Sequence, residues 1–68
     1  MKTENLLTIR EQEVLQLIAK AQPRKRIADC LAISVNTVNA HIANMHRKFR
    51  THSMVELTIV AVKSGSIN

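Results

Sequence analysis

The chain has 68 residues, 46% of them hydrophobic, with one Gly, one Pro, one Cys and a formal net charge of +5. A chain of this length and composition forms one small, mostly helical domain, which excludes a disordered chain and a disulfide framework. Because it also lacks a signal peptide and a hydrophobic run near the roughly 20 residues that cross a membrane, we expect a cytoplasmic protein with no membrane partner.

A first helix is predicted to begin after Thr8, which follows a lead-in of residues 1–7. Thr8 and Glu11 have the spacing of a capping box, in which each side chain accepts a hydrogen bond from the other residue's backbone N–H. Glu11 and Glu13 would point in different directions on a helix, so they suit a cap and salt bridges rather than paired acid–base catalysis. Because the first helix begins after Thr8, we assign residues 8–68 to the folded domain. The expected apolar residues of this helix are Val14, Leu15, Leu17, Ile18 and Ala21.

A second helix is predicted to run from Arg24 to Ala32, and Pro23 suits its first position because proline there lacks only an N–H that would be unpaired anyway. About three residues, 32–34, separate this helix from the next. Two helices joined by so short a link must cross steeply, which is the helix-turn-helix arrangement.

A third helix is predicted from apolar residues that recur at steps of three and four, and Ser34 stands before them where its side chain can cap the helix. The opposite surface carries short amides and alanines, with cations toward the end of the helix. Such a surface can approach a large, negatively charged object closely, and the major groove of DNA admits one helix. The apolar stripe consists of Val35, Val38, Ile42, Met45 and Phe49.

The positive charge is concentrated around these two helices. From Lys20 to His52 the chain has seven Lys and Arg residues against one carboxylate, Asp29, whereas the rest of the chain has three cations and four carboxylates. This concentration is typical of a polyanion binder. The only aromatic residue, Phe49, belongs to the apolar stripe, and single-strand binders usually need exposed aromatic rings, so the pattern favours duplex DNA.

A fourth helix is predicted to begin after Ser53, which forms a second capping box with Glu56, and to stop at Gly65. One apolar face of this helix suffices to dock on three small helices. A second apolar face lies roughly a third to a half turn away, and we predict that it forms a homodimer contact. A fully buried C-terminal helix in a monomer is the alternative. The second face consists of Val55, Ile59 and Val62.

With these residues placed, the chain resembles the DNA-binding output domain of the LuxR/GerE family of bacterial transcription regulators, over about residues 7–67. The resemblance implies an all-α, four-helix fold, in which the second and third helices form the helix-turn-helix and the fourth makes the dimer contact. Several separated motifs at consistent spacing carry it. These are residues 7–15 (LTIREQEVL), 27–31 (IADCL), 33–38 (ISVNTV), 41–42 (HI) and 48–49 (KF).

The resemblance also implies the contacts with DNA, since the third helix of that family enters the major groove. The candidate base-contacting residues are Asn36, Asn39, Ala40, Ala43 and Asn44. The candidate phosphate-contacting residues are Lys25, Ser34, Thr37 and Lys48, to which we add Arg47 on the groove-facing side. The chemistry agrees, because Asn can pair with adenine, Ala can pack on a thymine methyl group, and lysines and hydroxyls suit phosphate oxygens.

Two departures from the family pattern stand out. Asn39 occupies a position that is often basic in the family, so a contact to guanine or phosphate is replaced by one suited to adenine. The glycine that the family usually has near positions 21–22 is absent, which affects the geometry expected for the first turn.

We predict a sequence-specific, double-stranded-DNA-binding transcription regulator that acts as a dimer on an inverted repeat, with RNA polymerase as a further candidate partner. The chain fits either a standalone regulator or the output domain of a longer protein. The alternatives are a module like region 4 of a sigma factor and a basic protein-interaction module without DNA specificity. No enzyme motif is present, and no cofactor or metal is expected, because His41 and His46 point in different directions.

Overall fold

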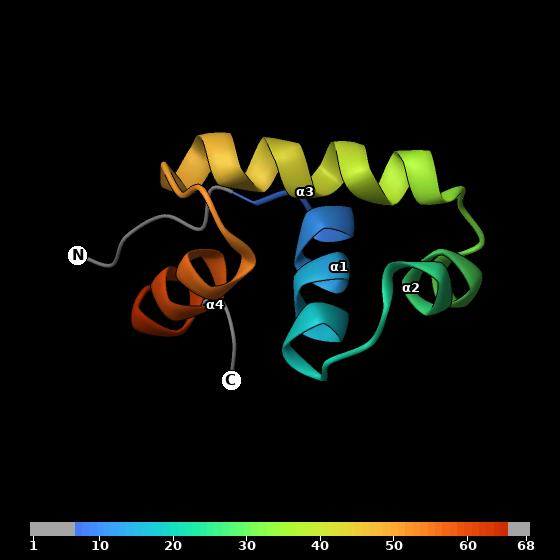
Figure 1. Cartoon of the computed structure of the whole chain (residues 1–68), viewed down its shortest axis with the longest axis horizontal. Coiled ribbons are helices and arrows are strands. Elements are labelled where there is room, and N and C mark those ends of the chain that lie inside the picture. The colour runs from blue at the N-terminus through green and yellow to red at the C-terminus, as the bar shows by residue number, and fades with distance from the viewer. Residues whose placement is uncertain (1–6, 66–68) are drawn as a thin grey trace.

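The computed structural model describes residues 7–65, which form four helices and no strand (Figure 1). The helices are α1 (Ile9–Ala19), α2 (Arg24–Leu31), α3 (Val35–Phe49) and α4 (Met54–Lys63). The prediction of an all-α, four-helix fold is therefore confirmed. Of the predicted lead-in, residues 1–7, only Leu7 is described, and its side chain is buried in the core; the others lie outside the described residues.

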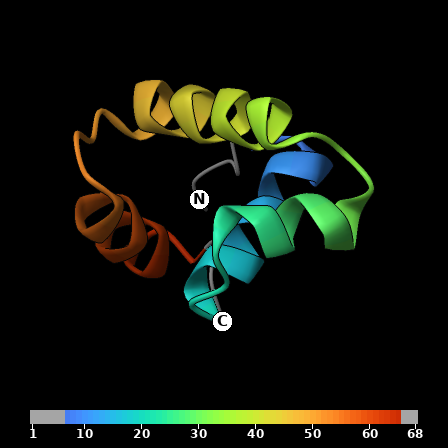
Figure 2. The ribbon, with the colours of Figure 1, turned by 45° about the vertical axis from the view of Figure 1, so that its right-hand side comes forward.

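The longest helix, α3, extends across one side of the molecule, and the other three helices lie beneath it (Figure 1). α1 packs under its middle, α2 lies toward its N-terminal end and α4 toward its C-terminal end, an arrangement that the turned view also shows (Figure 2). One face of α3 is thus committed to the core. Its opposite face is left uncovered by the described residues.

A compact apolar core holds the four helices together, and every helix contributes to it. The predicted stripe of α3 is only partly correct: Val38, Ile42 and Met45 are buried, whereas Phe49 is half-buried and Val35 is exposed. The two exceptions have a common reason, since they are the terminal residues of α3 and lie at the margins of the core. The largest fully buried side chains are Leu15, Ile27, Met45, Leu57, Val14 and Val38.

The helix starts follow the capping residues of the sequence. Thr8 and Glu11 form the predicted capping box at α1, with both N···O distances at 3.1 Å. Ser53 Oγ accepts a hydrogen bond from Glu56 N–H at 3.1 Å, as predicted for α4. The second bond of this predicted capping box, from Ser53 N–H to the Glu56 carboxylate, is wrong. The carboxylate instead accepts a hydrogen bond from the backbone N–H of His52 at 2.6 Å.

The link between α2 and α3 is as short as predicted, but the details of α2 differ at both ends. Pro23 is the N-cap residue in extended conformation and not the first helical residue. Ala32 lies outside α2 in the left-handed conformation, with φ of 57°, and this reversal turns the chain toward α3. The two helices with this link form the helix-turn-helix unit.

Ala21 was predicted on the apolar face of the first helix, and this is wrong: it lies past the end of α1, exposed, with φ of 62°. A left-handed residue with a Cβ atom costs roughly 1–2 kcal/mol, which glycine avoids. The glycine expected near this position thus had a conformational reason.

Replacing Ala21 by glycine is therefore expected to raise the free energy of unfolding by about 0.5–1 kcal/mol, since relief of the strain exceeds the about 0.4–1 kcal/mol that the extra freedom of the unfolded chain costs. Thermal and urea unfolding followed by circular dichroism measure it. The matched change Ala40→Gly, in the exposed middle of α3, is expected to destabilise by about 1 kcal/mol. If Ala21→Gly destabilised as much as Ala40→Gly, the turn would not have this conformation.

Candidate nucleic-acid interface

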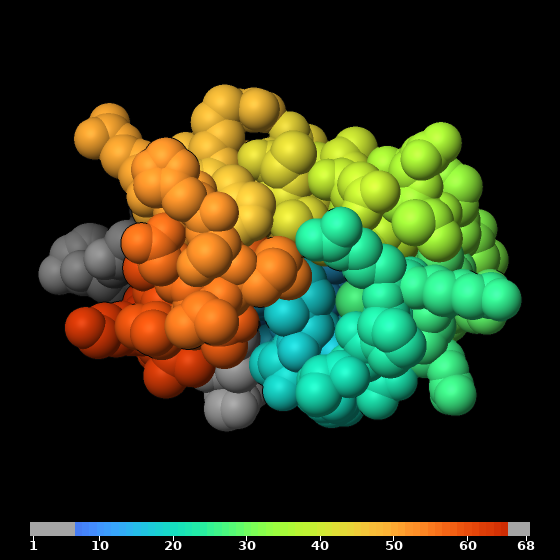
Figure 3. Space-filling view, viewed as in Figure 1, coloured from blue at the N-terminus to red at the C-terminus, as the bar shows by residue number. Residues whose placement is uncertain are grey.

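The uncovered face of α3 contains the residues predicted to contact bases. Asn36, Asn39, Ala40 and Ala43 are all exposed, and Asn44 is half-buried at the margin. Within residues 7–65, the carboxamides of Asn36 and Asn39 make no hydrogen bond. This face therefore presents two unengaged amides and two methyl groups on a rigid helix. In the space-filling view, the surface of α3 runs along the upper edge of the molecule and continues into that of α2 (Figure 3).

Two hydroxyl groups lie at the N-terminal end of α3. Ser34 Oγ accepts the backbone N–H of Thr37 at 3.0 Å, which confirms Ser34 as the cap, and its oxygen lies 3.0 Å from Thr37 Oγ1. Both residues are exposed. They lie at the positive end of the helix dipole, so together they suit a phosphate oxygen. Lys25, the phosphate candidate on α2, is also exposed.

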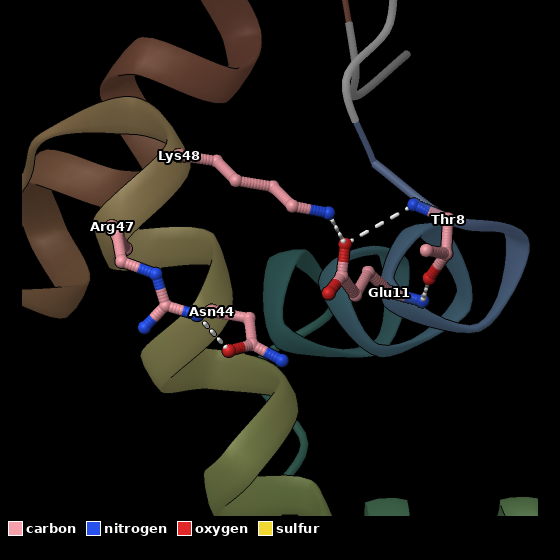
Figure 4. A network of polar contacts seen from close by, with 5 residues as sticks. All are labelled: Thr8, Glu11, Asn44, Arg47 and Lys48. Atoms are coloured by element: carbon pink, nitrogen blue, oxygen red, sulfur yellow. Dashed lines mark hydrogen bonds and ion pairs between the residues drawn. The ribbon is translucent and has the colours of Figure 1, made fainter.

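The C-terminal end of α3 holds two cations in different ways. Arg47 is exposed, and its Nη2 donates a hydrogen bond to Oδ1 of Asn44, one turn earlier (Figure 4). Lys48 extends instead toward α1, where its Nζ lies 2.6 Å from Oε1 of Glu11 (Figure 4). Asn44 thus has its oxygen engaged, and Lys48 is bonded to Glu11 within the protein.

Glu11 connects the start of α1 with the end of α3, and it is only 3% exposed. Its carboxylate accepts hydrogen bonds from Thr8 N–H and from Lys48, which ties the start of α1 to the end of α3. Burial raises the pKa of the Glu11 carboxyl, but the bonds from Lys48 and Thr8, with the charges of Lys48 and His41, outweigh burial and hold the pKa below its usual value.

The lowered pKa of Glu11 predicts a pH dependence of stability. A carboxyl with a lower pKa in the folded state contributes stability above its unfolded pKa, about 4.3, and loses it as the pH falls through the folded value. We expect wild type to lose stability relative to Glu11→Gln as the pH is lowered from 6 to 3. Parallel unfolding free energies of the two proteins over this range would contradict the ion pair.

The pairing of Glu11 with Lys48 was missed by sequence reasoning, which assigned the two residues to a cap and to phosphate contact. The residues are 37 positions apart, and spacing rules for helices cover only neighbours three or four apart. The bond between Asn44 and Arg47 does have that spacing, three residues, and could have been predicted from it.

The second face of α4 is exposed in the single chain: Val55 is 69%, Ile59 49% and Val62 55% exposed. A fully buried C-terminal helix, the alternative to a dimer contact, is therefore not what the chain forms. Next to this face lies an open hollow of about 340 Å³ between α1 and α4, lined mainly by apolar atoms. The lining residues are Ile18, Met54, Val55, Thr58 and Ile59.

Other kinds of site find little support in residues 7–65. They contain no group of three or more His, Cys, Asp or Glu residues that could hold a metal ion. None of their helices has the length and hydrophobicity needed to cross a bilayer. The uncovered face of α3 and its flanking polar groups are thus the candidate functional site.

Comparison with known proteins supports this choice. The family model described as bacterial regulatory proteins of the luxR family matches residues 5–61. The chain is 43% identical over 63 residues to the uncharacterized response regulatory protein YgeK of Escherichia coli, covering 93% of this chain and 43% of that protein. It is 42% identical over 55 residues to the nitrate/nitrite response regulator NarL of E. coli, covering 81% and 26%. The chain thus spans less than half of the length of these two relatives.

Two solved structures are similar as well. The transcription factor GerE superposes with a TM-score of 0.90 at 31% identity, covering 96% of this chain and 97% of GerE. VqmA of Vibrio cholerae, in a complex with ligand and DNA, gives a TM-score of 0.84 at 33% identity, covering 98% of this chain and 30% of VqmA. The four-helix arrangement is therefore shared over nearly the whole chain.

Proposed function

The chain belongs to the luxR family of bacterial regulatory proteins, and from this we propose that it binds a specific duplex DNA sequence with α3 in the major groove. As a helix-turn-helix domain of this family, it serves DNA binding in transcription regulation, and the family is not one of enzymes. The observation that carries the proposal is the exposed face of α3, which bears short polar and methyl side chains between hydroxyls at one end and a cation at the other.

The size of the side chains supports insertion into the groove. A helix with its side chains is about 10–12 Å across, and the major groove is about 12 Å wide, so small side chains let the helix backbone come close to the base edges. Asn39, Ala40 and Ala43 are such side chains in the middle of the exposed face. A basic protein-interaction module would not need such a face.

Groups around this face suit the DNA backbone. Ser34 and Thr37 offer hydroxyls at the N-terminal end of α3, Lys25 a cation on α2, and Arg47 a guanidinium that Asn44 orients. Lys48 contacts Glu11 and its side chain is 30% exposed, so we propose that it is shared between Glu11 and a phosphate. Asn44 then acts as a positioning residue at the margin, and Asn36 remains a base-contacting residue.

We further propose that the protein binds as a homodimer through Val55, Ile59 and Val62 on an inverted repeat. Three exposed apolar side chains on one helix face support a contact between two copies. A two-fold contact on α4 leaves α3 of each copy available for its own half-site. Contact with RNA polymerase stays a prediction.

The salt dependence of binding tests the proposal. With about four or five phosphates neutralised per protomer, we expect log affinity for a specific duplex to fall with log salt at a slope near −4 per protomer. Lys25→Ala should weaken binding to all sequences alike and make the slope shallower by about 1. Fluorescence anisotropy with labelled duplexes over a range of salt concentrations measures both effects.

Lys63→Ala is the matched control, since it removes the same charge from the last residue of α4, for which no phosphate contact is proposed. It is expected to leave the slope within about 0.3 of wild type, because counterion release counts only phosphates that are contacted. Affinity that does not vary with salt would rule out the DNA proposal. Equal effects of the two substitutions would mean that only net charge matters, as for a basic protein-interaction module.

A further inference from the structure

We propose that α3 reads a half-site made mainly of A·T pairs and makes no direct contact of its own to guanine. The inference rests on the proposed function, because it requires α3 to lie in the major groove. It concerns the chemical class of duplex that this groove-facing surface selects, which family membership does not decide.

The first observation is that the middle of the reading face lacks a cation. The chain has no Lys or Arg between Arg26 and Arg47, so the face formed by Asn36, Asn39, Ala40 and Ala43 is neutral. Guanine presents two acceptors, N7 and O6, in the major groove, and Arg or Lys is the usual partner for both. The centre of the face therefore offers no such donor.

The second observation is that the two cations at the C-terminal end of α3 make hydrogen bonds within the protein. Arg47 donates to the Asn44 carboxamide, and Lys48 is turned toward Glu11 beneath α3 (Figure 4). His41, the only ring donor between Asn36 and Ala43, is half-buried, and its charge contributes to lowering the pKa of Glu11. Arg47 and Lys48 are thus directed at Asn44 and Glu11 and not at the middle of the reading face.

The third observation is that the Asn and Ala side chains of the reading face fit both bases of an A·T pair. Adenine offers an acceptor at N7 and a donor at N6, which an amide matches only when both its oxygen and its nitrogen are unengaged. Asn36 and Asn39 satisfy this condition within residues 7–65, whereas Asn44 does not. The methyl groups of Ala40 and Ala43 can pack on the C5-methyl of thymine.

The spacing of these residues sets the length of the half-site. Asn36 and Ala43 are seven residues apart, which is about 10 Å along a helix with 1.5 Å rise per residue. Base pairs follow each other every 3.4 Å or so, and the reading face therefore covers about four of them. Because each A·T pair shows adenine and thymine features in the same groove, consecutive A·T pairs can satisfy the amides and the methyl groups together.

Selection of duplexes from a random pool by the purified chain is the first test. We expect the selected half-site to have A·T pairs at three or more of its four central positions. Selected half-sites with two or more G·C pairs there would overturn this inference while leaving the proposed function intact. A pool that yields no enriched sequence would overturn both.

Base analogues in the selected duplex give the second test. Replacing one contacted adenine by 7-deaza-adenine removes N7 and should weaken binding of wild type about tenfold. At the adenine that Asn39 contacts, the same replacement should not change the binding of Asn39→Ala. Replacing a contacted thymine by uracil removes the methyl group and should lower the affinity of wild type about threefold. At the thymine that Ala43 contacts, the same replacement should not change the affinity of Ala43→Gly. If wild type and both variants respond alike at every position, these side chains do not read the bases, and the inference is overturned.

Discussion

Replacing Lys48 by alanine is expected to lower the free energy of unfolding by about 3 kcal/mol, at the lower end of the range for breaking a buried ion pair. The reason is the partner that remains, since the Glu11 carboxylate is 3% exposed and would lose the ammonium group 2.6 Å away. The lower end applies because the Lys48 side chain is itself 30% exposed. In so small a domain this loss is a large part of the total stability. Urea unfolding at pH 7 followed by circular dichroism measures it.

The chain contains a matched control in the ion pair between Arg10 and Glu13. These side chains lie 3.2 Å apart and are 44% and 49% exposed, so Arg10→Ala should cost only about 0.5 kcal/mol. The double variant Glu11→Gln with Lys48→Ala should recover part of the loss, because the amide leaves no uncompensated charge and still accepts the Thr8 N–H. If Lys48→Ala cost no more than Arg10→Ala, the pair would have no structural role, and Lys48 would be wholly available to DNA.

This ion pair also explains what the sequence could and could not predict. Caps such as Thr8 and Ser34 depend on residues three positions away, and the helix starts that follow from them were correct. The separation of core and surface on α3 follows from helical periodicity and was correct in the middle of the helix. Neither rule reaches from Glu11 to Lys48, because that contact exists only after α1 has packed beneath α3.

Local sequence rules also fail at the ends of the helices, where packing decides which residues are covered. Val35 fits the apolar period but is exposed, because periodicity gives the direction of a side chain and not whether another helix covers it. Ala21 continues the apolar pattern of α1, yet the chain turns there with a positive φ, which local propensity does not favour for alanine. For the proposed DNA contacts, the sequence identified exposed residues of α3 and has the spacing of the bond between Asn44 and Arg47, whereas the bond from Lys48 to Glu11 is evident only in the folded chain.

The substitution Ile59→Glu is expected to abolish paired binding while leaving the fold intact. On the proposed function, one recognition helix covers about four base pairs, which are too few to specify a site in a genome, so we expect two copies to bind together. Ile59 is 49% exposed and borders the hollow between α1 and α4, so the change places a carboxylate twice in a two-fold contact. We expect apparent affinity for a duplex with two half-sites to fall about 100-fold, to that for one half-site. Band-shift titrations on duplexes with one and two half-sites measure this.

Ile9→Glu is the matched control, because Ile9 is 82% exposed at the start of α1 and the change of side chain is the same. It should leave both affinity and stoichiometry unchanged. Circular dichroism should show all three proteins folded, since Ile59 contributes only part of its surface to the core of one chain. Unfolding of Ile59→Glu would mean that Ile59 belongs to that core, and unchanged paired binding would remove this face of α4 as the dimer contact. Finding the protein monomeric in dilute solution would not contradict the dimer contact. Two adjacent half-sites hold two copies next to each other, so even a weak contact between them raises the affinity.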